Sequence, residues 1–422
     1  MVVEAPNTRG LAHAVFLSRV GELPATSPEV RLGQGAFLAL RLVDLLAPDR
    51  EPVQPDVFRY QLAATDRYCS ELAQEGIEAA HLNGVVRSAG EAFRRKDAGL
   101  VIPALFAYVY HLENSLHLEE ALDVVETLLR VGGRNLVQKD AIAAHLRLGL
   151  LHRNLARFDE ADTAYRNAQQ LAEASGDGHS ILLSRVGRAF SLMRRGNLAT
   201  AEQDLKGILA DAQGASDLDA QARAEHVLGD VLYKRGQAHE AAPHLWRAFG
   251  LYEESAAQVR ALSDLGLVMR ALGDIPGAER ALHEVVRRGG ENNANATLNA
   301  QIELMYCASS RNDRVGFERF RARCERSLDS MLPNMMVDFR LKEGIAQARF
   351  GNFRKARQLL DVAQSEASAH RLHEFEFRID RIKAGLGDCE EVAREGLHAT
   401  AEPVLQTEAL REVSASLALL GA

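Results

Sequence analysis

Few residues in the sequence have the type and spacing that enzymatic chemistry requires. A phosphate-binding loop of the GxxxxGK type is absent, because Gly-Lys never occurs as a dipeptide, and no GxGxxG motif opens a helix after a strand. A serine elbow of the GxSxG type is absent as well, and Cys307 with its neighbours Ala308 and Ser309 resembles no thiol-protease signature. The sequence therefore predicts a protein that is not an enzyme, with no catalytic residues and no cofactor.

The histidines are the other side chains that could do chemistry, by binding a metal. His370 and His373 lie three residues apart with Glu374 adjacent, which is close enough on a helix to share a face. A closed zinc site needs four ligands, so this group indicates a solvated helix end. His145 and His152 are seven residues apart on one expected helix, and we assign them no ligand role. We predict no metal site.

The elements that carry these residues repeat along the chain. The segment LGDVLYKRGQAHEAAPHLWRAF, which begins at Leu228, has small residues at regular places, and similar segments precede and follow it. The central small residue of each second helix falls at Ala121, Ala161, Ala201, Ala241 and Ala278, near Phe317, and at Ala356. The steps are 40, 40, 40, 37, 39 and 39 residues. A fixed period of this kind is the signature of a repeat architecture.

The small residues have a packing reason. Two antiparallel helices approach most closely where Gly or Ala replaces a bulky side chain, so Ala241→Trp should lower the melting temperature. Glycines before the second helix of a pair supply a turn conformation that other residues adopt only with strain. These turn glycines are Gly196, Gly236, Gly273 and Gly351.

The alternation of small and large residues resembles that of the tetratricopeptide repeat from about residue 101 to about residue 366. The period of about 40 residues exceeds the period of about 34 that is usual in that family. Repeats of this longer kind look like those of bacterial regulators and of kinesin-light-chain-type adaptors. The resemblance implies an all-α fold, a right-handed α-α superhelix of antiparallel helix pairs with helical caps at both ends.

We expect three segments. Residues 1–100 form an N-terminal helical region, which could include a divergent repeat; residues 101–366 form the tandem array; and residues 367–422 form C-terminal helices that cap it. Ser27 and Pro28 predict the N-cap and first turn of a helix that ends at Ala47. A helix pair follows at about 57–72 and 76–93.

The last expected helix has one apolar stripe, formed by Leu410, Val413, Leu417 and Leu420. A terminal repeat needs a cover over its exposed face, so we expect this stripe to cap the last repeat. The alternative is self-association of the chain through the same stripe.

The resemblance also implies where a ligand binds, because residues near the end of the first helix of each pair point into a concave groove in this family. The alignment of the repeats puts eight residues there: Asn114, Arg153, Asn154, Arg194, Tyr233, Lys234, Arg270 and Arg349. Arg can bind carboxylate or phosphate with two hydrogen bonds, so an acidic peptide or a phosphorylated segment is one candidate partner. In the other interpretation, these cations only complement the helix dipoles and stay solvated.

The middle of the first helices is mostly apolar in this sequence. The positions are Leu146 with Leu150, Val186 with Phe190, and Ser263 with Leu267. Carboxylate-clamp cochaperones have Lys and Asn there, so we do not expect a chaperone C-terminus as the ligand. An amphipathic helix would fit such a groove, whether it comes from a partner or from the chain's own termini.

Composition narrows the class of partner. The formal charge of −8 argues against binding of duplex nucleic acid along the whole chain. The four cysteines are far apart and the first residues show neither a signal peptide nor a membrane span, so we expect a cytoplasmic protein. We predict a non-catalytic adaptor or scaffold that binds a peptide or helix in its groove. The alternatives are a regulatory sensor, whose superhelix responds to a small signal or peptide and controls a partner protein, and a structural subunit of a larger assembly.

Overall fold

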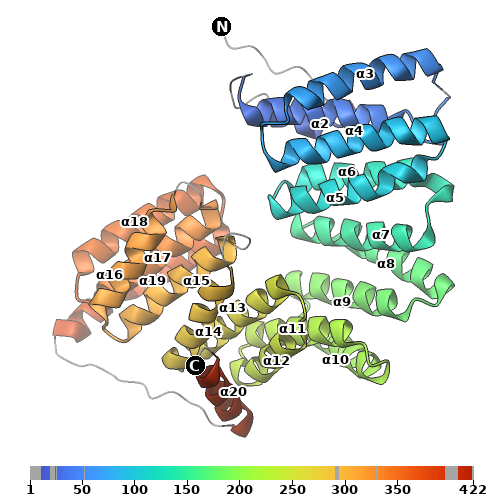
Figure 1. The fold of residues 1–422 in the computed structure, drawn as a ribbon. Coiled ribbons are helices and arrows are strands. Elements are labelled where there is room, and N and C mark those ends of the chain that lie inside the picture. Colours follow the sequence, from blue (N-terminus) through green and yellow to red (C-terminus); the bar gives the residue numbers. More distant parts are fainter. Residues whose placement is uncertain are drawn as a thin grey trace. The chain divides into compact units, whose positions relative to one another are not determined.

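The computed structural model is entirely helical in the parts that it describes, which are residues 11–19, 24, 26–51, 53–289, 294–328, 331–394 and 407–420. These parts contain 19 α-helices and three short 3-10 helices, packed pairwise in sequence order. The predicted all-α helix-pair fold is therefore confirmed. The chain divides into two compact units, Met1–Gly196 and Asn197–Ala422, which are described one at a time below (Figure 1).

The first unit begins with the 3-10 helix η1 (Ala14–Ser18) and continues with helices that pack on their neighbours in the sequence. Its α-helices are α2 (Pro28–Asp44), α3 (Pro55–Glu71), α4 (Ile77–Arg95), α5 (Ile102–Asn114), α6 (Leu118–Gly132), α7 (Gln138–Asn154), α8 (Phe158–Ser175) and α9 (Gly178–Arg194). Two further 3-10 helices, η2 (Ala98–Val101) and η3 (Gly133–Asn135), lie before α5 and after α6.

The predicted start of the first long helix is confirmed. The hydroxyl oxygen of Ser27 accepts a hydrogen bond from the backbone N–H of Val30 at 3.4 Å, and Pro28 occupies the first turn of α2. The helix ends at Asp44, three residues before the predicted Ala47. The next two helices, α3 and α4, match the predicted pair with ends displaced by one or two residues.

The second unit continues the succession of paired helices. Its α-helices are α10 (Leu198–Gly214), α11 (Leu218–Lys234), α12 (Ala238–Leu251), α13 (Ser255–Ala271), α14 (Ile275–Gly289), α15 (Ala294–Ser310), α16 (Arg314–Glu325), α17 (Pro333–Arg349), α18 (Phe353–Ala369), α19 (His373–Arg394) and α20 (Glu408–Leu419). Each odd-numbered helix from α11 to α17 packs against the even-numbered helix that follows it and against the next odd-numbered helix. We call α11, α13, α15 and α17 the odd-helix layer.

The small residues lie at the helix crossings, as predicted. A Cβ atom added to Gly229 on α11 would come within 2.7 Å of the Leu245 side chain and 3.3 Å of the Ala241 carbonyl oxygen on α12. Ala241 itself is fully buried. The turn glycines are also confirmed, since Gly236 has a φ of 80° and Gly273 a φ of 82°, values at which a side chain would be strained.

The pair α15/α16 departs from this rule. Phe317, which is almost fully buried, stands on α16 where the other second helices have Ala. The turn before α16 uses Asn312 with a φ of 57° in place of glycine. Asn tolerates this left-handed conformation better than most residues, so the irregular repeat keeps the same turn.

The two C-terminal helices cover different parts of the second unit. Helix α19 packs on α17 and α18, with Ile379 fully buried. Helix α20 packs on α12 and α14, where its residues Leu410, Val413 and Leu417 are buried. The expectation that this stripe covers the last repeat is therefore wrong, because α19 already lies on that pair. Self-association through α20 stays a prediction and would require the stripe to leave α12 and α14.

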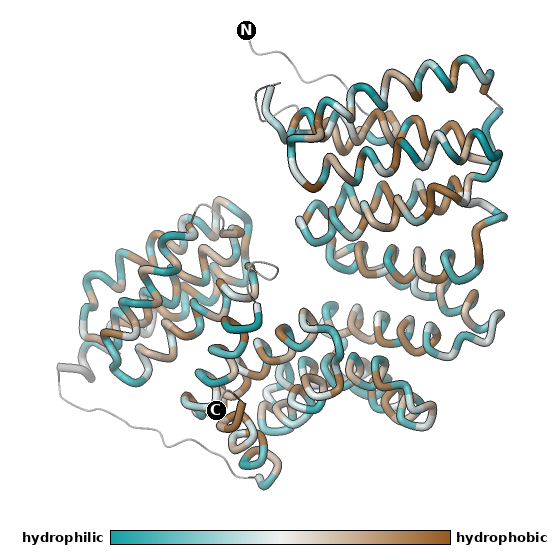
Figure 2. Tube along the Cα trace, in the orientation of Figure 1, coloured by the Kyte–Doolittle hydropathy of each residue, from teal (hydrophilic) through white to brown (hydrophobic). Residues whose placement is uncertain are grey.

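The helices carry both hydrophobic and hydrophilic positions along their length (Figure 2). Within the described residues, no helix combines the length and the apolar character that crossing a bilayer would need.

Candidate functional site

The eight predicted contact residues lie at the C-terminal ends of odd-numbered helices in both units. In the first unit, Asn114 ends α5, Arg153 and Asn154 end α7, and Arg194 ends α9. In the second unit, Tyr233 and Lys234 end α11, Arg270 lies in the last turn of α13, and Arg349 ends α17. The repeat alignment thus located equivalent helix positions, while a role in ligand contact stays a prediction.

Three of these arginines lie over aromatic rings of a neighbouring odd-numbered helix. In the first unit, the guanidinium of Arg153 lies 4.0 Å from the ring centroid of Phe190. In the second unit, Arg270 and Arg349 both lie over Tyr306, at 5.1 Å and 4.2 Å. Each contact of this kind is worth about 0.5–1 kcal/mol at an exposed site. These guanidinium groups are therefore held by protein contacts, which the interpretation as purely solvated cations did not foresee.

Hydrogen bonds fix Arg349 further. Its guanidinium donates to the hydroxyl oxygens of Ser309 at 2.9 Å, Ser310 at 2.8 Å and Tyr306 at 2.9 Å. All three acceptors lie near the end of α15. An exposed cation at the end of α17 is thus oriented across the odd-helix layer.

A set of ion pairs joins three helices of the same layer. Glu303 on α15 accepts from Lys342 on α17 at 2.6 Å and lies 3.2 Å from the Nε of Arg270 on α13. The Lys342 ammonium also contacts Asp338, and this side chain is only 5 % exposed. Burial alone would lower the pKa of Lys342, but the charges of Glu303 and Asp338 raise it above its ordinary value. We call these residues the Glu303 network.

A second polar group lies on α11 and α13. His226 Nε2 lies 2.9 Å from a carboxylate oxygen of Asp264, and His226 Nδ1 lies 3.1 Å from the hydroxyl of Tyr252. Asp230, one turn after His226 on α11, completes a trio whose ligand atoms all lie within 4.8 Å of one another. We call His226, Asp230 and Asp264 the His226 cluster.

The protonation of the cluster follows from its surroundings. Burial raises the pKa of Asp230 to about 7, and the negative charge of Asp264 adds to the shift, whereas His226 and Lys234 oppose it. Burial alone would lower the pKa of His226, but the hydrogen bond to Asp264 and the two carboxylate charges raise it. Perturbed groups of this kind gather at functional sites more often than elsewhere.

The sequence reasoning missed this cluster, although a signal was present. His226 and Asp264 are 38 residues apart, which is one repeat step, so they occupy similar heights on successive odd-numbered helices. Asp230 is four residues after His226 and shares its helix face. Ligands from successive repeats lie about 40 residues apart in the sequence, so the spacing of neighbours along the chain does not show the cluster.

Comparison with known proteins bears on the fold. No family model matches the sequence, and no curated protein matches it either. Among solved structures, the Rap conjugation gene regulator of plasmid pLS20 in complex with the Phr* peptide has a TM-score of 0.54 at 11 % identity, covering 83 % of this chain and 96 % of that one. The chain is a tetratricopeptide-like repeat protein.

Two further structures are similar to this tetratricopeptide-like protein over most of their length. The apo form of the quorum sensor NprR from B. thuringiensis has a TM-score of 0.48 at 10 % identity, covering 83 % of this chain and 90 % of that one. Aspartyl phosphate phosphatase F from Bacillus subtilis has a TM-score of 0.46 at 12 % identity, covering 82 % and 95 %. At these identities the likeness concerns the fold alone, and the absence of enzyme activity stays a prediction.

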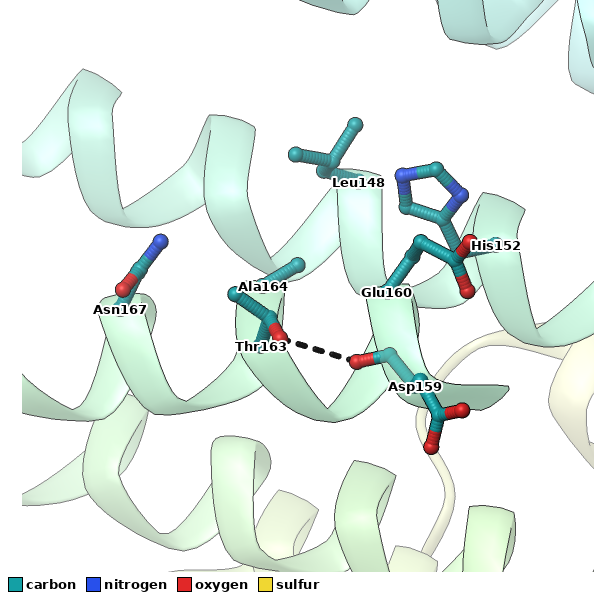
Figure 3. A pocket seen from close by; sticks show the side chains of 7 residues that line it. All are labelled: Leu148, His152, Asp159, Glu160, Thr163, Ala164 and Asn167. Carbon is teal, nitrogen blue, oxygen red and sulfur yellow. Dashed lines mark hydrogen bonds between the residues drawn. The ribbon is translucent and has the colours of Figure 1, made fainter. Parts of the chain in front are cut away.

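A shallow depression of about 470 Å³ lies on the pair α7/α8 of the first unit (Figure 3). Its lining residues are Leu148, His152, Asp159, Glu160, Thr163, Ala164 and Asn167. The Thr163 hydroxyl donates to the backbone carbonyl of Asp159 at 2.9 Å, so this proton is not available for a hydrogen bond to a ligand (Figure 3). Burial lowers the pKa of His152. The odd-helix layer offers a larger set of converging charged and aromatic groups.

Proposed function

We propose that this chain is a non-catalytic regulatory protein that binds a peptide along the odd-helix layer of its second unit and thereby alters its binding to a second protein. The observation that carries the proposal is the chain of side-chain contacts along that layer. Charged and aromatic groups lie on all four helices, and several link one helix to the next. A peptide that lies across them meets hydrogen-bond donors, acceptors and ring faces in succession.

The odd-helix layer carries positively and negatively charged side chains, so we propose that the peptide also carries charges of both signs. The exposed Lys234 and Arg349 would bind acidic groups of the peptide, as the sequence analysis expected. The carboxylate of Asp264, which is 38 % exposed, would bind a donor. Tyr233, which is half-buried beside Lys234, offers a ring for an apolar side chain.

The Glu303 network supports the regulatory part of the proposal. It joins α13, α15 and α17 through side chains, so a peptide group that competes for Arg270 would weaken one of the links between neighbouring helices. A ligand shifts a conformational equilibrium only through different contacts in the two states. Loss or gain of these ion pairs would supply that difference.

The experiment is a selection of peptides from a random display library against the full chain, followed by fluorescence anisotropy with the selected peptides. The test variant is Tyr233→Ala with Lys234→Glu, which changes two residues at the end of α11. The control is Arg354→Glu, an exposed charge reversal on α18 in the same unit. We expect at least about tenfold weaker binding to the test variant, equivalent to about 1.4 kcal/mol, and unchanged binding to the control.

Equal binding to both variants would contradict a site on the odd-helix layer. The second candidate function, a scaffold that holds its partner without a response, differs in what the peptide does to the protein. Hydrogen exchange distinguishes the two, because a regulatory peptide should also change the protection of helices that it does not cover, whereas a scaffold ligand should protect only the helices that it covers.

A further inference from the structure

We propose that the His226 cluster is a binding site for a divalent transition-metal ion such as Zn²⁺, with His226 Nε2 and the carboxylates of Asp230 and Asp264 as its protein ligands. This inference goes beyond the peptide-binding function proposed above and does not rest on it, although Asp264 belongs to both proposed sites. It rests on the positions of the three ligand atoms, on the group that orients the histidine, and on the charges around the cluster.

The geometry brings one ligand atom from each residue to a common point. His226 and Asp230 are one turn apart on α11, Asp264 lies on the adjacent α13, and the three ligand atoms lie within 4.8 Å of one another. Bonds from zinc to nitrogen or carboxylate oxygen are about 2.0–2.2 Å long, so two ligands of one ion lie up to about 4 Å apart. A side-chain adjustment of less than one ångström closes that gap.

Tyr252 holds the imidazole in the orientation that a ligand needs. Its hydroxyl oxygen lies 3.1 Å from His226 Nδ1 and can accept a hydrogen bond from the Nδ1–H, which leaves the lone pair on Nε2. With Nδ1 bonded to this group, Nε2 faces the carboxylates. Metal-binding histidines commonly use the second ring nitrogen in this way, because the bond fixes the ring and its tautomer.

The charged groups around the cluster are compatible with a bound cation. Arg223, a cation near the cluster, already donates to Asp219 at 2.9 Å. Asp230 has no hydrogen bond or ion pair with another side chain in the described parts of the chain. The charges of Lys234 and Arg260 also act on the cluster, but both residues are exposed, so solvent weakens their effect. Two neighbouring carboxylates, one of them unpaired, are the arrangement that a bound cation would stabilise.

The ligand set indicates which ions fit. One imidazole nitrogen with two carboxylate oxygens suits Zn²⁺, Mn²⁺ or Co²⁺, whereas Ca²⁺ and Mg²⁺ prefer oxygen ligands throughout. Three protein ligands leave at least one coordination position for water or for a donor atom from another molecule. Because Asp264 is 38 % exposed, that position is open to solvent.

The test uses the full chain after treatment with EDTA and desalting. Isothermal titration with ZnCl₂ measures affinity and stoichiometry for the wild type, for His226→Gln and for Asp230→Asn, two substitutions that nearly preserve size. The control is His239→Gln with Glu240→Gln on α12, an exposed histidine–carboxylate pair 3.6 Å apart. We expect about one equivalent of Zn²⁺ to bind the wild type and the control, and affinity to fall more than about tenfold in both cluster variants.

Equal binding by the wild type and His226→Gln would overturn the proposal, since the ion would then be held by other surface groups. If the variants do not fold, the wild type alone decides the question through the visible absorption of bound Co²⁺. An intense absorption spectrum at one equivalent, typical of Co²⁺ with a low coordination number, supports the site. A weak spectrum, typical of hydrated Co²⁺, overturns the proposal. Tyr252→Phe adds a check on the positioning role, with an expected loss of about tenfold in affinity.

Discussion

The N-terminal end of the first unit and the odd-helix layer of the second use the same residue types in different ways. Arg19 lies between Glu78 and Glu120, and each of these three side chains is at most 11 % exposed. Tyr108, fully buried, donates to Glu78 at 2.8 Å. In this cluster every charged group has an opposite partner, whereas the odd-helix layer exposes Arg349 and leaves Asp230 without a partner among the described residues.

The difference indicates what each network does. A closed, buried set of ion pairs fixes the position of the chain segment that carries it, here the segment of η1, whose Phe16 is fully buried. Opening such a set is costly because it leaves a charge unpaired away from water. A set that reaches the surface with unfilled bonding capacity can bind a ligand without that cost. The following predictions test this contrast.

The largest effect is expected where the closed network loses its cation. Arg19→Met leaves Glu78 and Glu120 side by side with little solvent, so we expect a loss of about 3–5 kcal/mol in the free energy of unfolding. The measurement is urea unfolding of the full chain followed by circular dichroism. The control is Arg59→Met, which breaks the ion pair between Arg59 and Asp56. These two side chains are 71 % and 95 % exposed, so this substitution should cost less than about 0.5 kcal/mol. Equal losses would show that the Arg19 cluster is not a closed network.

A helix crossing in the second unit gives the next largest effect. Ala241 is fully buried, and its carbonyl oxygen lies close to the backbone of Gly229 on α11. Ala241→Trp should therefore lower the stability by about 1–3 kcal/mol, measured as a lower melting temperature. Gly250→Ala on the same helix is the control, because an added Cβ there meets no atom within 4 Å. It should be neutral or slightly stabilising, since Ala favours helix more than Gly does.

The sequence predicted the crossings and turns because they depend on local rules. A small residue on each helix and a glycine at the turn recur with the period, so Gly229, Ala241 and Gly236 could be assigned from spacing alone. The position of α20 could not. Its stripe of Leu410, Val413 and Leu417 predicts burial, but several helix surfaces of a repeat protein could accept it. The choice depends on contacts such as the 2.8 Å hydrogen bond from Ser414 to Asp274, 140 residues away in the sequence.

The buried ion pairs were equally hidden in the sequence. Lys342 and Glu303 have the residue types of a solvated helix face, and most such residues are exposed. Only the juxtaposition of α15 and α17 shows that they are buried together. The helix-end positions of the eight residues were therefore predictable, the contacts between helices were not, and a role of those residues in ligand binding stays a prediction.

A second buried set of contacts in the first unit, around His13, predicts a pH dependence at the N-terminal segment. His13 is buried, with Nδ1 2.6 Å from Asp123 and Nε2 3.2 Å from Asp44. Burial alone would lower the pKa of His13, but these bonds and charges raise it, so its charged form stabilises the folded state. This contribution is fully present below the unfolded value of about 6.5 and is lost as the pH rises through the folded value.

His13→Gln removes this dependence. We expect the wild type to exceed the variant in stability by about 1–2 kcal/mol near pH 6 and by less near pH 9, measured by urea unfolding at each pH. Both proteins keep Asp44, whose pKa is lowered despite the opposing effect of burial because it bonds to His13 and faces Arg130 and Arg50. The contribution of Asp44 to stability is lost as the pH falls through its lowered pKa. Because the variant lacks the bond from His13 to Asp44, its loss of stability in acid should be smaller. A difference that does not change with pH would show that His13 acts by packing alone.

The smallest expected effect gives the most direct comparison of the two networks, because the same type of substitution, arginine to lysine, is made in each. Arg349→Lys keeps the charge in the odd-helix layer but loses the planar contact with Tyr306 and some of the hydrogen bonds to Ser309 and Ser310. At this exposed position we expect a loss below about 1 kcal/mol in urea unfolding. Arg19→Lys, which loses the fork of donors between two buried carboxylates, should cost more. If Arg349→Lys costs as much as Arg19→Lys, the odd-helix layer is a structural network, and the case for a ligand site there is lost. If Arg349→Lys costs little stability but weakens the binding of a selected peptide, the exposed guanidinium contributes to ligand binding.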